Sequence, residues 1–331
     1  MGDVILALPM VQALKKFIPE SEIDFICIPS TANVLENHRA INKVIQYDKK
    51  GDGKVGKLND IIRQVKNEHY DIVLSPHRSF RSALITYCSK AQVRIGFDIN
   101  SLSFLLTHKV PYVKQKHEIL RNLNLLGAID GFDIIDSKSS LKAELHPSEI
   151  DTKLMESLRS QAGPGKLITI APCSRWFTKQ LTISKTTEII KALHEKGYTV
   201  LMLGGPDDFF YCREVRNIVN NREKLINMCA RLTPLQSYLI IKKSDALISV
   251  DSAAQHLGGA SDTPIVLIYG STNKSFGFYP LTSKYTIIEN TELTCRPCTD
   301  HGREKCPLGH FKCIEDLSVN KIIEEAEKFI I

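Results

Sequence analysis

One stretch of the chain, residues 245–270, limits the possible folds more than any other. It reads DALISVDSAAQHLGGASDTPIVLIYG, in which an apolar run ends at Val250, small residues follow, and a second apolar run opens at Pro264. The pattern predicts a strand, a tight turn, a short helix and a second strand. Such a turn presents an acid, a hydroxyl and free backbone N–H groups at a helix N-terminus, where a phosphate or a sugar hydroxyl binds. From these residues alone, a phosphate site and a simple helix cap both remain open.

The same alternation of apolar strand and helix runs through the whole chain. Strands are predicted at 22–28, 43–47, 71–75, 92–97, 166–171, 198–203, 225–228, 245–250, 264–269 and 284–289. Helices are predicted at 4–18, 57–67, 79–89, 116–127, 182–196, 207–220, 234–243 and 252–260. This alternation predicts an α/β protein with parallel sheets covered by helices on both faces.

The polar segment 145–166, which contains Pro and Gly, predicts an interdomain linker. We therefore expect one domain over residues 1–150 and a second over residues 165–331, the latter ending in a helix. Two doubly wound, Rossmann-like domains would face each other across a central cleft at the carboxyl ends of their strands.

The chain opens on a helical pattern with no strand before it, whereas a doubly wound domain normally begins with a central strand. Gly2 and Asp3 resemble the turn that follows such a strand. We therefore expect that the first strand of the amino-terminal domain is missing from this sequence, together with roughly ten residues of the natural chain.

The composition is that of a water-soluble globular protein, with 43% hydrophobic and 24% charged residues. The net charge of +6 suits an anionic substrate or a loose contact with a membrane surface. We interpret it as too weak and too evenly spread to indicate nucleic acid. No apolar run approaches the roughly 20 residues that span a bilayer, and the opening residues lack the features of a signal peptide.

Three loops predicted at the carboxyl edge of the second sheet carry groups that suit a diphosphate. They combine hydroxyls, a lysine, glycines that let a ligand approach the backbone, and the acidic turn described above. Taken one at a time, these loops also fit a solvated loop, a common Gly-Gly-Pro turn and a helix cap. The candidate donor-binding residues are Ser174, Thr178, Lys179, Gly204, Gly205, Asp251, Ser252, Ala253 and His256.

Candidate residues in the first half lie at Asp3 and in the segment SPHRSFRS. Asp3 at a helix start is either a cap or a carboxylate held ionised by the helix dipole, which would suit a general base. His77, Arg78 and Arg81 follow a predicted strand and suit an anionic acceptor, although a solvated helix start fits equally well. The segment GDGKVG at 51–56 has the spacing of a dinucleotide fingerprint but is lysine-rich and loop-like, so we reject that interpretation.

Nine cysteines are present. Five are scattered and often apolar in context, which is typical of reduced, buried thiols. The other four form the pattern C-x2-C-x7-C-x6-C near the carboxyl terminus, which suggests either a structural Zn or Fe site or four reduced thiols in a loop. The candidate metal ligands are Cys295, Cys298, Cys306 and Cys313.

These motifs, in this order, resemble glycosyltransferase family 9, the bacterial lipopolysaccharide heptosyltransferases. The resemblance covers nearly the whole chain and includes GDVILALPMVQALKKFIP, HRSFRSAL, RIGF, HEILRNLNLLG, PCSRWFTKQL, GYTVLMLGGPDD, ISVDSAAQHLGGASDTPIVLIYGST and CRPCTDHGREKCPLGHFKC. It is strongest toward the second and third inner-core heptosyltransferases. It implies the GT-B fold and an inverting transfer of heptose from ADP-heptose to lipopolysaccharide core, without a catalytic metal or other required cofactor. It also implies a cytoplasmic enzyme, peripheral to the inner membrane, whose acceptor is lipid A–core oligosaccharide.

The resemblance also implies roles for individual residues. Asp3 would be the general base, and Lys179, with Thr178 and Ser174, would clamp the diphosphate of the leaving ADP. Asp251, Ser252, Ala253 and His256 would form the donor-binding turn, and His77, Arg78 and Arg81 would face the acceptor. Many family members have Gly where Ala253 stands.

Two other functions remain open at this point. The same scaffold suits a transferase of another sugar from another nucleotide diphosphate. The alternative from a different class is a non-catalytic binding protein, such as a nucleic-acid module, that is stabilised by a metal at the cysteine cluster. Against it, the basic residues form no single stripe and aromatic content is only 7%.

Overall fold

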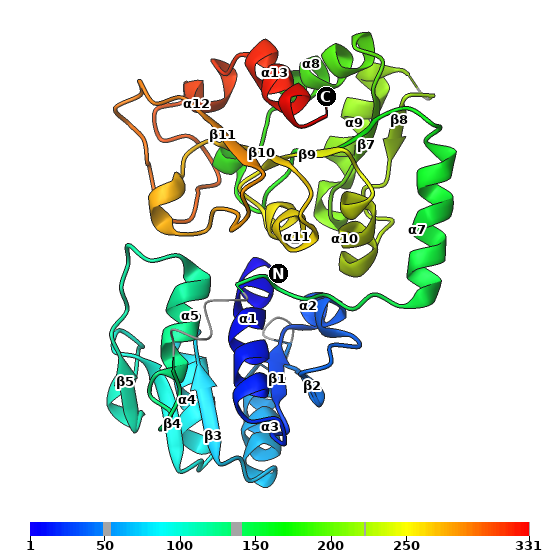
Figure 1. Ribbon diagram of the computed structural model, residues 1–331. Coiled ribbons are helices and arrows are strands. Elements are labelled where there is room, and N and C mark those ends of the chain that lie inside the picture. Colours follow the sequence, from blue (N-terminus) through cyan, green and yellow to red (C-terminus); the bar gives the residue numbers. More distant parts are fainter. Residues whose placement is uncertain (49–53, 134–140, 222, 331) are drawn as a thin grey trace. The chain divides into compact units, whose positions relative to one another are not determined.

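The computed structural model describes residues 1–48, 54–133, 141–221 and 223–330 of the 331-residue chain. The chain divides into two compact units, Asp3–His146 and Pro147–Ile331, and each is treated by itself (Figure 1). Part of the rejected GDGKVG motif lies outside the described residues. Among the described residues, no helix has both the length and the hydropathy needed to cross a membrane.

The amino-terminal unit alternates helices and strands, with ends close to those predicted. Its helices are α1 (Gly2–Phe17), α2 (Pro29–Ala32), α3 (Lys54–Asn67), α4 (Phe80–Cys88) and α5 (Glu118–Leu126), with 3₁₀ turns η1 (Asn33–Leu35) and η2 (Ser103–Leu105). Its strands are β1 (Asp24–Cys27), β2 (Lys43–Gln46), β3 (Ile72–Ser75), β4 (Val93–Phe97) and β5 (His108–Val110). Strand β5 escaped prediction because it has three residues and two of them are exposed polar side chains.

These five strands form two parallel sheets. Strand β1 pairs in parallel with β2, and β3, β4 and β5 form a separate parallel sheet in that order. Helix α1 supplies much of the core of this unit, because one run of its side chains from Ile5 to Val11 is buried. Its Pro9 lies inside the helix, and the Asn122 side chain of α5 donates a hydrogen bond to the Leu6 carbonyl oxygen at 3.1 Å.

The carboxyl-terminal unit contains one six-stranded parallel sheet with the order β11-β10-β9-β6-β7-β8. Its strands are β6 (Leu167–Ala171), β7 (Thr199–Met202), β8 (Leu225–Asn227), β9 (Ala246–Val250), β10 (Ile265–Tyr269) and β11 (Tyr285–Glu289). The strand order reverses direction between β6 and β9, which are hydrogen-bonded neighbours. A parallel α/β sheet binds its ligand at such a switch point, outside the carboxyl ends of the strands.

Helices and short turns connect these strands. The helices are α7 (Glu149–Gln161), α8 (Ile183–Glu195), α9 (Phe209–Val219), α10 (Pro234–Lys242), α11 (Ala253–Ser261), α12 (Lys312–Glu315) and α13 (Val319–Ile330). The 3₁₀ turns are η3 (Phe177–Lys179), η4 (Pro206–Asp208) and η5 (Lys274–Phe276). The expected final helix is α13, which packs against α8 and the sheet.

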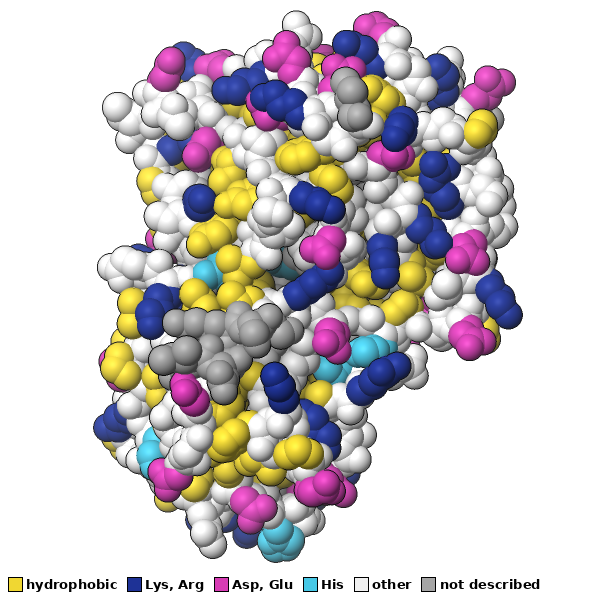
Figure 2. Space-filling model, in the orientation of Figure 1, with side chains coloured by type: hydrophobic (Ala, Val, Ile, Leu, Met, Phe, Trp, Pro, Cys, Tyr) yellow, Lys and Arg dark blue, Asp and Glu magenta, His cyan; other side chains and the backbone are white. Residues whose placement is uncertain are grey.

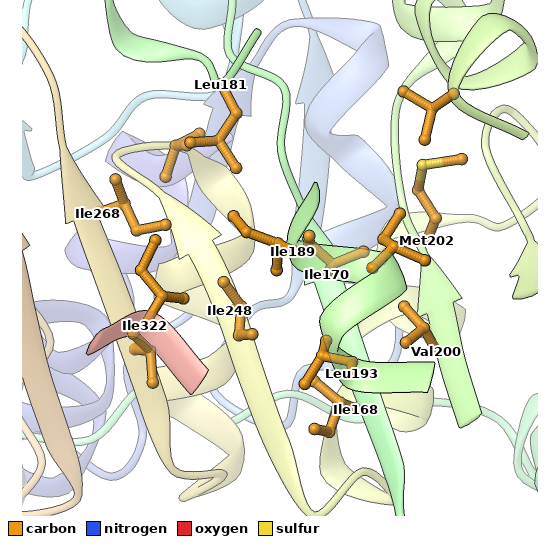
Figure 3. Close-up of a cluster of buried hydrophobic side chains, with 14 of the residues drawn as sticks. Ile168, Ile170, Leu181, Ile189, Leu193, Val200, Met202, Ile248, Ile268 and Ile322 are labelled. Atoms are coloured by element: carbon orange, nitrogen blue, oxygen red, sulfur yellow. The ribbon is translucent and has the colours of Figure 1, made fainter. Parts of the chain in front are cut away.

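Central strands of this sheet are buried along their whole length, which explains their continuous apolar sequences. Ile168 and Ile170 of β6, Ile248 of β9 and Val200 of β7 pack with apolar side chains from α8 and α13 (Figure 3). This core fixes the positions of the strand ends, and therefore of the loops that follow them.

The polar segment 145–166, which we expected to be a linker, contains helix α7. Ser148 caps this helix by accepting the Asp151 N–H at 3.0 Å. The helix joins the carboxyl-terminal unit, because Asp151 accepts a hydrogen bond from Gln236 of α10 at 2.7 Å and Arg159 donates to the Lys243 carbonyl oxygen at 3.3 Å. With Met155 as its one buried residue, the helix has too little apolar signal to be predicted from the sequence.

Candidate active site

An ion pair lies at the switch point of the carboxyl-terminal sheet. The Lys179 ammonium nitrogen is 2.7 Å from Oδ2 of Asp251, and both side chains are largely buried. Lys179 lies in the loop after β6, and Asp251 follows β9 directly. Because these strands are parallel neighbours, their carboxyl ends bring the two residues together, as the sequence led us to expect of this sheet edge.

Asp251 is held by side chains on both sides. Its Oδ2 accepts a hydrogen bond from the Thr272 hydroxyl at 2.7 Å, and its Oδ1 accepts one from the Gln255 amide at 2.9 Å. With Lys179, these contacts give the buried carboxylate the partners that it requires. Asp251 therefore acts as a fixed anchor that orients the lysine ammonium at the edge of the sheet.

Helix α11 begins beside this ion pair. Its N-cap residue, Ser252, is half-buried, and its hydroxyl makes no capping hydrogen bond with the backbone that the structure describes. The first-turn N–H groups of a helix attract anions, so this start suits a phosphate better than the simple cap that we also considered. Ala253 and His256 lie in the first two turns, and the Ser174 hydroxyl donates to the Asp251 carbonyl oxygen at 3.4 Å.

Thr178 has a structural role, not the ligand-binding role expected of its hydroxyl. It is 2% exposed, and its hydroxyl donates to the Arg303 carbonyl oxygen at 3.2 Å while accepting the Arg303 N–H at 2.8 Å. It also accepts the Ser271 hydroxyl at 2.9 Å. The hydroxyl is therefore fully used to fasten two later loops to the segment that carries Lys179.

The Gly204-Gly205 turn also has a packing explanation. A Cβ atom on Gly204 would lie 2.9 Å from the Cys229 sulfur and 3.1 Å from the Cys212 sulfur, so close packing requires glycine there. The Gly205 N–H donates to Oδ2 of Asp208 at 2.7 Å and is thus already satisfied. Burial raises the pKa of this Asp208 carboxyl.

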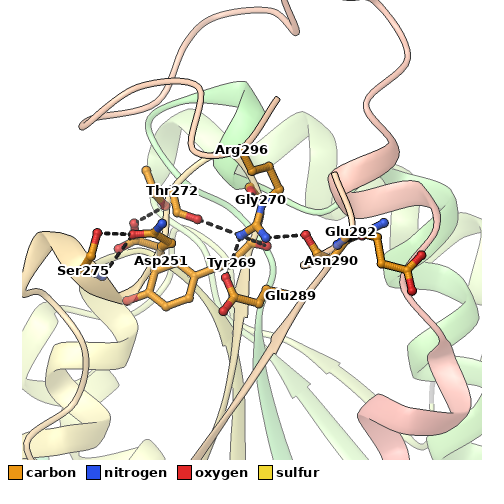
Figure 4. A network of polar contacts seen from close by, with 10 residues as sticks. Asp251, Tyr269, Gly270, Thr272, Ser275, Glu289, Asn290, Glu292 and Arg296 are labelled. Carbon is orange, nitrogen blue, oxygen red and sulfur yellow. Dashed lines mark hydrogen bonds and ion pairs between the residues drawn. The ribbon is translucent and has the colours of Figure 1, made fainter. Parts of the chain in front are cut away.

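Arg296 is a residue of this region that our sequence analysis missed. Its guanidinium donates hydrogen bonds to the carbonyl oxygens of Gly270 and Thr272 and pairs with Glu289 at 2.8 Å (Figure 4). The side chain is 5% exposed, so it clamps the loop after β10 from inside. Since Thr272 binds Asp251, Arg296 supports the ion pair indirectly. Its position within the motif CRPC was the signal, but we attributed that motif to its cysteines alone.

Gly302 explains how Lys179 is covered. This residue has a φ of +100°, and a Cβ atom there would lie 2.6 Å from the Trp176 Cβ and 2.9 Å from the Lys179 Cδ. The segment around Gly302 therefore packs directly on the lysine stem, and only glycine allows that approach.

In the amino-terminal unit, Asp3 is exposed in the first turn of α1. Burial raises the pKa of Glu118 of α5 despite its hydrogen bond from Arg121, and the Asp3 carboxylate contributes to that rise. Glu118 is therefore a second carboxyl group close to the expected base, and nothing in its sequence context marked it.

The three expected acceptor residues lie in and after the loop between β3 and α4. The His77 Nδ1 atom is 3.0 Å from the Ser79 hydroxyl oxygen, and the Arg78 guanidinium lies 4.5 Å above the ring of Tyr112. Arg81 is exposed on α4. The structure therefore gives His77 and Arg78 defined positions and leaves the Arg81 cation at the surface.

For the four carboxyl-terminal cysteines the sequence left open a structural metal site and four reduced thiols, and the structure describes all four as free thiols. Over the described residues, which include all four, no group of three or more His, Cys, Asp or Glu side chains is placed to hold a metal ion. The Cys295 sulfur lies 4.0 Å from His310 Nε2, whereas the Cys298 thiol donates to the Cys295 carbonyl oxygen at 3.1 Å. Burial raises the pKa of Cys313 to about 11.

Comparison with known proteins shows the family of the chain. The sequence model of glycosyltransferase family 9 (heptosyltransferase) matches residues 58–308. The chain belongs to this family. The non-catalytic binding protein considered above is therefore set aside, and the chain is a glycosyltransferase.

Individual relatives agree with this assignment over most of their length. The chain is 25% identical to lipopolysaccharide heptosyltransferase 3 of Escherichia coli (strain K12), covering 83% of this chain and 81% of that protein. A solved glycosyltransferase family 9 structure from Veillonella parvula DSM 2008 has a TM-score of 0.85 at 21% identity, covering 100% of this chain and 94% of the other. The E. coli ADP-heptose lps heptosyltransferase II has a TM-score of 0.81 at 19% identity, covering 99% and 95%. With the parallel sheets, these similarities confirm the expected GT-B fold class.

Proposed function

We propose that this family 9 enzyme moves heptose from ADP-heptose to the inner core of lipopolysaccharide, with inversion and without a catalytic metal. The observation that carries the proposal is the Lys179–Asp251 pair beside the start of α11, at the switch point of the carboxyl-terminal sheet. Support for the sugar and the acceptor comes from the relatives, which are named as lipopolysaccharide heptosyltransferases.

On this proposal, the carboxyl-terminal unit binds the donor nucleotide. The first-turn N–H groups of α11 and the hydroxyls of Ser174 and Ser252 hydrogen-bond the diphosphate. Lys179, oriented by Asp251, donates its remaining N–H groups to the phosphate oxygens and neutralises the charge that builds on the departing ADP. The other proposed members of this donor site are Gly204, Gly205, Ala253 and His256, while Thr178 supports the loop.

The transfer itself is a single displacement. The acceptor hydroxyl oxygen attacks the anomeric carbon on the face opposite the diphosphate, and the bond from that carbon to the phosphate oxygen breaks. The electron pair of the broken bond leaves with ADP, and the hydroxyl proton passes to the carboxylate of Asp3. Asp3 thus removes the proton of the attacking hydroxyl, and stabilisation of the diphosphate by Lys179 and the start of α11 takes the place of the Mg²⁺ used in many phosphate-leaving reactions.

The acceptor in this proposal is lipid A–core oligosaccharide, an anionic molecule carried by a membrane. His77, Arg78 and Arg81 are the residues that we assign to it, because cations pair with its phosphates. The enzyme would then work at the cytoplasmic face of the inner membrane as a peripheral protein.

A panel of donors tests the proposal directly. The thermal midpoint of the protein is measured with ADP-heptose, ADP, and GDP- and UDP-sugars, and transfer is measured with each sugar donor. A ligand that binds the native state stabilises it, by about 2.7 kcal/mol at a hundred times its Kd. We expect stabilisation by ADP and ADP-heptose alone. Stabilisation and transfer with a GDP- or UDP-sugar instead would support the alternative donor and refute this one.

A further inference from the structure

The positive charge of the chain is concentrated in one segment of the amino-terminal unit. Residues 72–117 contain seven Lys or Arg residues and a single acid, Asp98, a net charge of +6 that equals the net charge of the whole chain. The even spread that we inferred from composition is therefore wrong, since the remainder of the chain is neutral overall. The basic residues are Arg78, Arg81, Lys90, Arg94, Lys109, Lys114 and Lys116. On the face of the molecule shown in Figure 2, acidic and basic side chains are interspersed.

The sheet topology collects much of this segment at one edge. Strands β3, β4 and β5 are parallel neighbours, so the loops that follow them meet at the carboxyl edge of this small sheet (Figure 1). The Ser101 hydroxyl donates to the Arg78 carbonyl oxygen at 3.0 Å, joining the first two loops. The Tyr112 N–H donates to the Asp98 carboxylate at 3.0 Å, joining the second and third. The only acid of the segment is thus engaged within it.

Large apolar side chains are exposed in the same segment of the chain. Phe80 is 56% exposed, Ile99 51% and Phe104 71%. The turn η2, which carries Phe104, packs against α4, which begins at Phe80. One exposed apolar residue is ordinary, but three in neighbouring parts of one strongly basic segment indicate an interaction surface.

We propose that this carboxyl-edge patch is the surface with which the protein docks on an anionic lipid bilayer. The patch consists of Phe80, Ile99, Phe104, Arg81, Lys114 and Lys116. The apolar side chains would enter the boundary between headgroups and acyl chains, and the cations would pair with lipid phosphates. An aliphatic side chain such as Ile99 is stabilised by contact with lipid hydrocarbon but has no aromatic face on which a nucleic-acid base could stack. The patch therefore favours lipid over RNA. The inference rests on the proposed function, because a lipid-borne acceptor requires a bilayer contact.

The test is sedimentation of the full chain with vesicles of phosphatidylcholine containing phosphatidylglycerol, compared with phosphatidylcholine alone. We expect binding to the anionic vesicles that weakens as salt is raised. The variant Phe104→Ser should weaken it by about tenfold or more, because one buried phenyl group is lost. The variant Lys116→Gln should weaken it by about fivefold.

The chain offers a matched control in Phe210→Ser. Phe210 is 69% exposed and lies beside a cation, with the Arg213 guanidinium 5.0 Å from its ring, but it belongs to the carboxyl-terminal unit. The Phe210→Ser variant should therefore bind vesicles as well as the unmodified protein does. Circular dichroism and thermal midpoints check that each variant is folded, as expected for exposed positions.

The outcomes separate the patch from the proposed function. Equal weakening by Phe104→Ser and Phe210→Ser, or binding to an RNA oligonucleotide but not to anionic vesicles, would overturn the docking surface. Transfer to an acceptor freed of its acyl chains should be unaffected by Phe104→Ser, since no bilayer is involved. Absence of any transfer, with vesicle binding intact, would refute the proposed function and leave the patch standing.

Discussion

At the scale of single residues, the central feature is a pair of lysine–aspartate contacts that bridge the same two strands. Lys179 and Asp251 lie at the carboxyl ends of β6 and β9, whereas Lys166 and Asp245 lie at the amino ends, with Nζ and Oδ1 3.1 Å apart. The first pair is largely buried, while Lys166 is half exposed. Only the carboxyl-end pair lies beside a helix N-terminus suited to a phosphate.

This difference gives a prediction for Lys179→Ala. The variant should weaken ADP binding by roughly 10- to 100-fold, the range for a lost charge-assisted hydrogen bond, and should lower turnover as well. Isothermal calorimetry and initial rates measure the two effects. The variant Lys166→Ala is the control and should change neither. Similar losses in both variants would mean that Lys179 has no special part in donor binding.

Asp3 gives the complementary prediction. The variant Asp3→Asn should lower kcat by about 10²- to 10⁴-fold, the usual contribution of a general base, while ADP affinity stays unchanged. The exposed carboxylate of Asp60, which pairs with Arg63 on α3, serves as a control through Asp60→Asn. Loss of ADP affinity in Asp3→Asn would remove Asp3 from the role of base.

At the scale of elements, helix α11 shows how close packing positions the donor site. A Cβ atom on Gly258 would lie 2.7 Å from Leu247 Cδ2 and 3.0 Å from Ile265 Cδ1, so this turn of the helix lies directly on β9 and β10. The neighbouring Gly259 has room, because its nearest contact would be Pro280 Cβ at 3.8 Å. The close contact of Gly258 with the sheet therefore sets the position of the helix start, whereas Gly259 does not contribute to it.

The two glycines therefore respond to alanine in opposite directions. Gly258→Ala should lower the free energy of unfolding by about 1–2 kcal/mol, since overpacking outweighs the gain in helix propensity. Gly259→Ala should raise it by up to about 1 kcal/mol. Chemical denaturation measures both. A stabilised Gly258→Ala variant would show that the helix does not need this close approach to the sheet.

At the scale of the whole molecule, a buried histidine makes the stability of the fold sensitive to acid. In the amino-terminal unit, the His38 ring lies edge-on to His146 with 5.1 Å between centroids, and its Nδ1 accepts the Ala40 N–H at 3.2 Å. Burial, with a smaller effect from His146, lowers the pKa of His38 from 6.5 to about 4. The folded state thus keeps this ring neutral where the unfolded chain protonates it.

Stability should therefore fall as the pH decreases from about 6.5 to about 4, since the unfolded state binds the extra proton in that window. The loss should reach about 3 kcal/mol at the lower end. Denaturation curves between pH 4 and 8 measure it. The variant His38→Gln should flatten this dependence, and the exposed His69→Gln should not. An unchanged slope in His38→Gln would assign the acid sensitivity to other groups.

Local patterns along the chain were enough to establish the α/β class, the family resemblance and most strands and helices. These features depend on local properties: the apolar periodicity, the positions of glycine and proline, and the loops that follow strands. A buried parallel strand can be recognised directly from its continuous apolar sequence. The sequence predicted that Lys179 and Asp251 lie at the same edge of the sheet. It did not predict that they pair, because the strand order decides which loops become neighbours.

The tertiary structure alone decided what individual groups are used for. Thr178 fastens two loops, Gly204 makes room for two thiols, and Arg296 clamps a strand end from a distant segment. These roles depend on which buried polar atoms need partners and which surfaces touch, and both follow from the three-dimensional packing of residues far apart in the chain. The same reason explains the cationic edge of the small sheet, where separate loops meet only because β3, β4 and β5 lie side by side.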